Sequence, residues 1–90
     1  PVTVRVEAID RPGLLRDVAS VVAEEKLNII GSQVTVDGAE QIATIFATVE
    51  IATLPQLSRL LTRLETIRDV RLVYRDLGKN TATGRTARAN

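Results

Sequence analysis

The sequence has no cysteine, no histidine, no methionine and no tryptophan, and its aromatic residues are one phenylalanine and one tyrosine. Without cysteine, the chain can form neither a disulfide nor a thiolate metal site. Without histidine, it lacks the commonest general base and the commonest metal ligand. Neighbouring acids such as Glu24 and Glu25 point in different directions from a helix and are typical of a solvated surface. We therefore expect no catalytic residue, no metal ligand and no cofactor in this chain.

Long hydrophobic runs are also missing from the sequence. No apolar segment approaches the roughly 18 residues that a membrane-spanning helix needs, and no signal peptide is evident. These features predict a cytoplasmic protein without a membrane partner. The 90 residues are enough for one domain with an aliphatic core. Because the chain begins at Pro1 and continues directly into a strand-like pattern, we expect it to be part of a longer protein.

Positive charge is concentrated at the C-terminal end. The formal net charge is +1, but Lys79, Arg85 and Arg88 belong to a final stretch that contains no acidic residue. The alkaline isoelectric point therefore comes mainly from this stretch and does not indicate a nucleic-acid-binding domain. The same stretch lacks hydrophobic periodicity. We predict a folded domain over residues 1–76 and a disordered tail over residues 77–90.

Hydrophobic periodicity predicts four strands and two helices. Period-two alternation predicts strands over residues 2–9, 30–36, 42–51 and 70–75, and Asp37-Gly38 is typical of a hairpin turn between the second and third of them. Two segments have helical spacing instead, and their apolar positions are Leu15, Val18, Ala19 and Val22 in the first and Leu57, Leu60, Leu61 and Leu64 in the second. Pro12 is expected at the first position of the first helix, where its missing N–H costs nothing.

This order of elements predicts an α+β fold. Two β-α-β units around a central hairpin give the ferredoxin-like βαββαβ arrangement, a four-stranded antiparallel sheet with both helices on one face. The other face of the sheet is expected to be open and to display Arg5, Phe46, Arg71 and Arg75. Such a face with aromatic and basic side chains is the basis for one alternative function, contact with single-stranded RNA.

The junction between the first strand and the first helix, Asp10-Arg11-Pro12-Gly13, is the candidate ligand site. Gly13 at a helix entrance allows close approach, and the first turn of a helix offers unpaired N–H groups and partial positive charge to a carboxylate. Asp10 or Asn28 would hold an ammonium group beside it. The alternative interpretation is a tight strand-to-helix turn, because turns favour these residue types, with Asn28 as a helix cap.

Two long segments resemble a known family. The run VEAIDRPGLLRDVASVVAEEKLNI resembles the N-terminal half of an ACT domain, in which a strand, a D-R-P-G corner and an apolar helix precede an I/L-N-I segment. The run QIATIFATVEIATLPQLSRLLTRLETIRDVRLVYR resembles the ACT domain at the C-terminus of RelA/SpoT-type bifunctional (p)ppGpp synthetase/hydrolases. Together the two runs extend the resemblance over residues 2–76. It implies a regulatory, non-catalytic domain of a GTP pyrophosphokinase that senses amino acids or mediates dimer, interdomain or ribosome contacts in the stringent response.

The resemblance also implies a ligand and a partner. ACT domains commonly pair side by side or back to back, and many bind an amino acid between a strand–helix corner of one copy and the start of the second strand of another. Carried onto this sequence, one wall comprises Asp10, Arg11, Gly13, Leu14 and Leu15, and the other comprises Asn28, Ile29 and Ile30. Backbone N–H groups near Gly13 and Leu14 would bind the carboxylate, and Leu15 and Ile30 would suit a branched-chain amino acid.

Two alternatives are kept beside this interpretation. The first is an amino-acid-binding ACT domain of a biosynthetic enzyme, such as the regulatory subunit of acetolactate synthase, an aspartokinase or a dehydrogenase. The second comes from a different class, an RNA-contacting module similar to an RNA recognition motif, which could include contact with ribosomal RNA. Only Phe46 supplies an aromatic ring to the central strands, and Glu7 shares their expected face.

Overall fold

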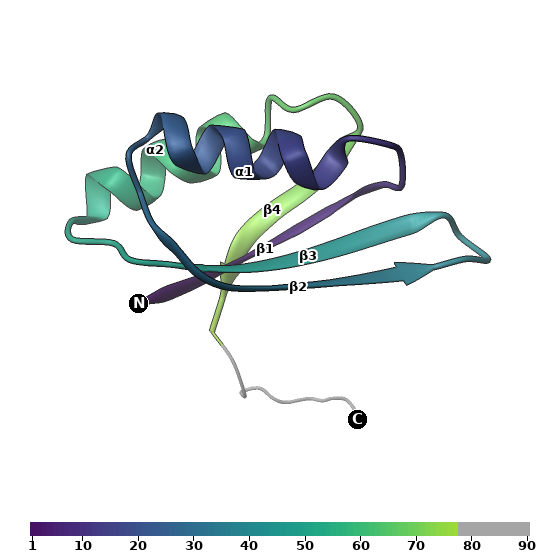
Figure 1. Ribbon diagram of the computed structural model, residues 1–90, viewed down its shortest axis with the longest axis horizontal. Coiled ribbons are helices and arrows are strands. Elements are labelled where there is room, and N and C mark those ends of the chain that lie inside the picture. Colours follow the sequence, from purple (N-terminus) through teal and green to yellow (C-terminus); the bar gives the residue numbers. More distant parts are fainter. Residues whose placement is uncertain (78–90) are drawn as a thin grey trace.

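The computed structural model describes residues 1–77 and confirms the predicted order of elements. The elements are β1 (Val2–Ile9), α1 (Leu14–Glu24), β2 (Ile29–Asp37), β3 (Ile42–Val49), α2 (Leu54–Leu64) and β4 (Val70–Asp76). The strands form one antiparallel sheet in the order β2-β3-β1-β4, and both helices cover the same face of it (Figure 1). Apart from Leu77, the predicted tail lies outside the described residues.

The core is aliphatic and lies between the sheet and the helices. The alternation in β1 and β3 places every second residue against the helices, as the sequence predicts. The buried hydrophobic residues are Val4, Val6, Ala8, Leu14, Val18, Val22, Ala43, Ile45, Ala47, Val49, Leu57, Leu60, Leu64 and Val73. No polar or charged residue among the described ones is fully buried. The two central strands, β1 and β3, therefore supply most of the sheet's contribution to the core.

Helix α1 begins at Leu14, two residues after the predicted first position, and buries a slightly different face than the sequence predicts. Pro12 is not the first helical residue, because Gly13 follows it as the N-cap with φ 82° and ψ 0°. This left-handed conformation is the one that glycine adopts without steric cost. The helix then buries Leu14, Val18 and Val22, whereas Leu15, predicted to face the core, is 48% exposed. Leu15 instead lies on the side of α1 that faces β2.

Helix α2 begins with a side-chain cap. Thr53 is the N-cap, and its side chain accepts a hydrogen bond from the Gln56 amide at 3.4 Å. The Gln56 side chain in turn accepts from the Thr53 amide at 3.0 Å, which completes a capping box. Two arginines of α2, Arg59 and Arg63, form ion pairs with Glu24 and Glu25 at the end of α1. These pairs join the exposed sides of the two helices.

Strand β4 contains a bulge that the sequence pattern does not reveal. Glu7 pairs with Leu72 and Ala8 pairs with Val70, so Arg71 is the extra residue between them. The shift places Val73 against the helices and Leu72 and Tyr74 on the open face. The prediction that Arg75 is displayed on the open face is therefore wrong, whereas Arg71 is exposed at the bulge itself. Arg75 pairs with the buried Val4 and so lies on the helix side of the sheet.

Candidate functional site

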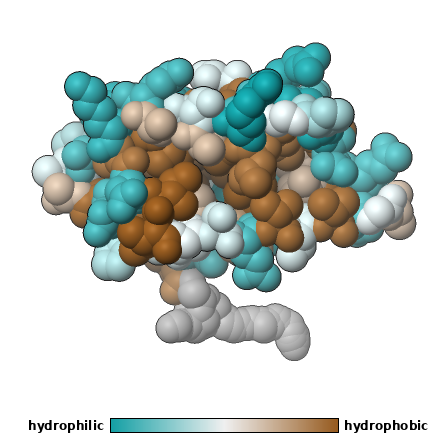
Figure 2. All heavy atoms as spheres, viewed as in Figure 1, coloured by the Kyte–Doolittle hydropathy of each residue, from teal (hydrophilic) through white to brown (hydrophobic). Residues whose placement is uncertain are grey.

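A groove lies beside the β1–α1 corner, between α1, the edge strand β2 and its neighbour β3. Its volume is about 460 Å³, and it is lined by Asp10, Arg11, Gly13, Leu14, Leu15, Arg16, Val34, Ala43 and Ile45. All five residues of the first predicted wall therefore line one groove. The groove exists because α1 covers β1 and β3 but leaves β2 uncovered, so Val34 and Val36 are 43% and 53% exposed. Figure 2 shows hydrophobic side chains gathered along the side of the molecule where α1 lies above β2.

The polar groups of this groove come from Asp10 and from the first turn of α1. Among residues 1–77, the Asp10 carboxylate has no hydrogen-bond or ion-pair partner. No side chain caps α1, and within the same range the amides of Leu15 and Arg16 have no acceptor. The Leu14 amide, predicted to bind a carboxylate, instead donates to the Arg11 carbonyl at 3.3 Å. The groove thus offers one acidic side chain together with free amides at a helix N-terminus.

Arg11 lines the groove but is committed to contacts within the protein. Its Nη2 donates to Asp17 Oδ2 at 2.7 Å and to the Arg68 carbonyl at 3.1 Å, and its Nε lies 3.3 Å from Asp69 Oδ2. The Arg11 side chain is only 11% exposed. Arg16, with a side chain that is 79% exposed, is the basic residue of the groove that remains accessible. Its Nη2 lies 3.1 Å from the position that a Cβ on Gly13 would take.

The second predicted wall lies at the opposite end of the domain. Asn28 Nδ2 donates to Glu50 Oε1 at 3.1 Å, and Asn28 lines a smaller hollow of about 270 Å³ near the start of α2. Ile29 pairs with Val49, and Ile30 is the irregular residue before Gly31 and is 50% exposed. Within one copy, Asn28, Ile29 and Ile30 are therefore not brought together with the β1–α1 corner.

Sequence reasoning missed Val34, Ala43, Ile45 and Arg16 as groove residues. The signal for Arg16 was available, because it occupies the first turn of the predicted helix. Val34, Ala43 and Ile45 depend on the order of strands in the sheet: Val34 pairs with Ile45, and Ala43 pairs with both Ala8 and Val36. The alternating pattern indicates that these residues face the helices. It does not reveal the order of the strands, and so it cannot show which of these residues lie beside the edge of α1.

The open face of the sheet carries a row of side chains that crosses all four strands. Gln33, Phe46, Arg5 and Tyr74 pair in sequence across β2, β3, β1 and β4. The Arg5 guanidinium lies 5.3 Å from the centre of the Phe46 ring and 5.6 Å from that of Tyr74. Arg5 also pairs with Glu7 at 3.1 Å. Burial in this row raises the pKa of Tyr74 above its usual value.

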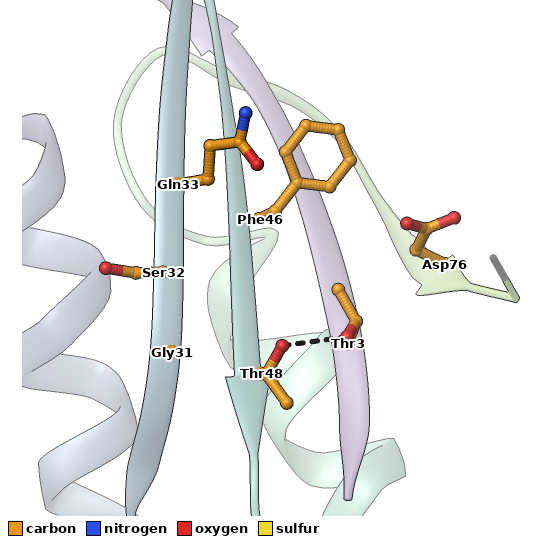
Figure 3. A pocket seen from close by; sticks show the side chains of 7 residues that line it. All are labelled: Thr3, Gly31, Ser32, Gln33, Phe46, Thr48 and Asp76. Carbon is orange, nitrogen blue, oxygen red and sulfur yellow. Dashed lines mark hydrogen bonds between the residues drawn. The ribbon is translucent and has the colours of Figure 1, made fainter.

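A shallow hollow of about 450 Å³ lies beside Phe46 on this face. Figure 3 shows Gln33 and Phe46 above it and the hydrogen bond of 2.8 Å between the Thr3 and Thr48 hydroxyls below. Gly31 has no side chain to fill this hollow. A Cβ added at Gly31 would lie 3.9 Å from Thr48 Cβ, which is an ordinary contact distance. The strand residues that the pairing places on this face include one base, Arg5, and three acids, Glu7, Asp37 and Asp76. This charge balance does not favour binding of a phosphate backbone.

The ion pair between Arg11 and Asp17 predicts a pH-dependent stability. The Arg11 hydrogen bond holds the pKa of Asp17 below its usual value of 3.8, against the opposing effect of burial. A lowered pKa in the folded state stabilises the fold above the pKa of the unfolded chain, and this stabilisation is lost as the pH falls through the folded-state pKa. We expect Asp17→Asn to lower the urea midpoint at neutral pH, and the difference from wild type to close below about pH 4.

The control for this measurement is Glu40→Gln, which removes an acid that has no ion pair among the described residues. Its urea midpoint should follow that of the wild type at every pH. A difference between Asp17→Asn and wild type that stays constant from neutral pH to pH values well below 3.8 would contradict the prediction.

Comparisons with known proteins decide the family. The family model described as the ACT domain matches residues 1–75. The chain belongs to the ACT domain family. This ACT domain is 46% identical over 67 residues to a GTP pyrophosphokinase of Escherichia coli K12, and the match covers 74% of the chain and 9% of that relative. It is 38% identical over 74 residues to the bifunctional (p)ppGpp synthase/hydrolase RelA of Mycobacterium tuberculosis, covering 82% of the chain and 10% of the relative.

Solved structures agree with the fold of this ACT domain. The crystal structure of the ACT domain from the GTP pyrophosphokinase of Chlorobium tepidum matches with a TM-score of 0.71 and 19% identity, covering 82% of this chain and 94% of that one. The small subunit of acetolactate synthase from Thermotoga maritima matches with a TM-score of 0.73 and 18% identity, covering 88% and 49%. The ACT domain is thus related in sequence to GTP pyrophosphokinases and spans about a tenth of their length. None of the helices within residues 1–77 is long and apolar enough to cross a membrane.

Proposed function

We propose that this ACT domain is a non-catalytic regulatory part of a longer (p)ppGpp synthetase/hydrolase, and that it binds a branched-chain amino acid in the groove beside the β1–α1 corner. The observation that carries the proposal is the composition of the groove. Asp10, whose carboxylate is unpaired among residues 1–77, and Leu15 and Arg16, whose amides have no acceptor there, line the same space. These are complementary to the ammonium and carboxylate groups of a free amino acid.

The apolar lining of the groove supports the choice of side chain. Leu15, Val34, Ala43 and Ile45 line it together, and all four are aliphatic. A branched aliphatic side chain would be removed from water against them, and each buried CH₂ group contributes about 0.8 kcal/mol. A long charged side chain would leave its charge in an apolar space, which costs free energy. Valine, leucine and isoleucine are therefore the ligand class that the groove fits.

The difference between the two edge strands of the sheet, β2 and β4, supports a second copy of this chain as the partner. Native edge strands are protected by charges, bulges or proline. β4 has Arg71, Arg75 and Asp76 together with its bulge, whereas β2 has nine residues and no charge before Asp37. We infer that two copies pair through antiparallel β2 strands, which would extend the sheet from four strands to eight.

Such pairing would complete the site. Val36 lies at the β1–α1 end of the sheet, because it pairs with Ala43, which pairs with Ala8. Ile29 lies at the other end of β2. Antiparallel pairing therefore brings the start of β2 in one copy, with Asn28 and Ile30, toward the β1–α1 corner of the other. The two predicted walls would then face the same ligand.

Calorimetric titration with valine, leucine and isoleucine tests the binding site. We expect saturable binding of valine and at least tenfold weaker binding of valinamide and of isovalerate. Each analogue lacks one charged group, and a hydrogen bond to a charged group contributes about 1.5–3 kcal/mol. Lysine is the control for the apolar side chain. Absence of saturable binding by all three branched-chain amino acids, or equal binding of valine and valinamide, would contradict the proposal.

A further inference from the structure

The Arg11 side chain connects two loops that are distant in sequence. Its guanidinium donates to the Arg68 carbonyl from Nε at 3.4 Å and from Nη2 at 3.1 Å, across 57 positions of the chain. The same group pairs with Asp69 at 3.3 Å and with Asp17 at 2.7 Å. It also returns to its own loop, since Nη1 donates to the Pro12 carbonyl at 3.1 Å. The rigid planar fork of arginine thus joins the β1–α1 corner, the first turn of α1 and the α2–β4 loop.

The α2–β4 loop has an unusual backbone at the point of contact. Asp69 has φ 73°, which is uncommon for a residue other than glycine and persists only where surrounding contacts determine it. Its carbonyl accepts a hydrogen bond from the Ile9 amide at 2.9 Å, at the end of β1. The loop is therefore fixed both to β1 and, through its carboxylate, to Arg11. Asp69 does not line the groove.

Apart from Arg11, the corner is held by backbone hydrogen bonds, in which the Asp10 amide donates to the Gln41 carbonyl and the Asp17 amide to the Gly13 carbonyl, both at 2.9 Å. α1 has no side-chain cap, and the Leu14 amide makes a hydrogen bond of 3.3 Å to the Arg11 carbonyl. We propose that Arg11 is a positioning residue that sets the shape of the β1–α1 corner from the α2–β4 loop, so that Asp69 controls binding in a groove it does not touch. This inference rests on the proposed amino-acid site. By linkage, an occupied groove tightens the contact with Asp69 in return.

The test is Asp69→Asn, compared with Glu65→Gln. Asparagine tolerates the left-handed backbone at Asp69 and removes the carboxylate charge, which pairs with Arg11 at 3.3 Å and with the exposed Arg68 at 3.8 Å. Glu65 is an exposed acid at the end of α2, so its substitution removes the same charge nearby without touching Arg11. We expect Asp69→Asn to accelerate hydrogen exchange of the Leu14 and Asp17 amides, measured by NMR, by about threefold to fivefold. We expect it to weaken valine binding by a similar factor, with no change in Glu65→Gln.

Two readouts separate this inference from the proposed function. If the wild type binds no branched-chain amino acid, the proposed site falls, and exchange at the corner still decides whether Asp69 controls its shape. Unchanged exchange of Leu14 and Asp17 in Asp69→Asn would overturn the inference even if the wild type binds valine. Faster exchange with wild-type valine affinity would overturn it as well, because Arg11 would then hold the corner without positioning the site.

Discussion

Replacement of Gly13 by valine is expected to abolish amino-acid binding. Gly13 has φ 82°, a conformation in which a β-branched residue is a steric outlier. The left-handed backbone alone costs an L-residue about 1–2 kcal/mol, so the corner would be driven toward another conformation. That change would redirect the Leu15 and Arg16 amides, which are proposed to bind the ligand carboxylate. The added side chain would also crowd Arg16, whose Nη2 lies 3.1 Å from the new Cβ.

Titration calorimetry with valine measures this effect, and urea unfolding shows whether the variant is folded. Gly13→Ala serves as a milder variant, since it introduces the Cβ without the second branch. Gly38→Val is the matched control, because Gly38 has no atom within 4 Å of an added Cβ and lies in the β2–β3 turn. Wild-type affinity in a folded Gly13→Val protein would exclude the corner as the ligand site.

Val34→Lys is expected to convert a dimer into a monomer. Val34 is central in β2 and 43% exposed, so lysine at this position should leave the folded monomer intact. In a two-fold symmetric pairing of β2 strands, the two new ammonium groups would approach one another across the interface. Like charges brought together at an interface cost several kcal/mol, which corresponds to well over a tenfold weaker self-association. Sedimentation equilibrium over a range of concentrations measures the change.

Leu72→Lys is the matched control for this experiment. Leu72 is also a large exposed aliphatic residue, 50% exposed, but it lies on β4 at the other edge and on the open face of the sheet. Its substitution should leave β2 pairing unchanged. Dissociation by Leu72→Lys and not by Val34→Lys would show that copies associate through the open face instead. A wild type that stays monomeric at high concentration would contradict pairing through β2.

The elements of this fold could be predicted because their signals are local. Alternation in β1 and β3 and the spacing of Leu57, Leu60 and Leu64 reflect the two periods of regular structure, and the structure confirms them. The face of β4 could not be predicted, because the bulge at Arg71 shifts every later side chain by one position. That bulge depends on pairing with β1, which no local pattern encodes.

The candidate site was predictable in part for the same reason. Asp10, Gly13 and Leu15 lie within six positions of the chain, so the sequence alone can predict that they share one corner. In the structure they line one groove. The internal role of Arg11 depends on Arg68 and Asp69, which the fold brings beside it. The contribution of Val34 depends on β2 being an edge strand that α1 leaves uncovered.

The two helices differ in how their N-termini are capped, and this difference should make the two halves of the domain unequal in local stability. The capping box of α2 satisfies orphan amides with its own side chains, and such caps contribute about 0.5–2 kcal/mol. α1 has no equivalent and starts from a left-handed glycine. Transient opening should therefore begin in the N-terminal half, at the first turn of α1, while the α2 half stays closed. A small molecule bound at that turn would act as the missing cap. Its binding would therefore suppress the local opening of the first turn of α1.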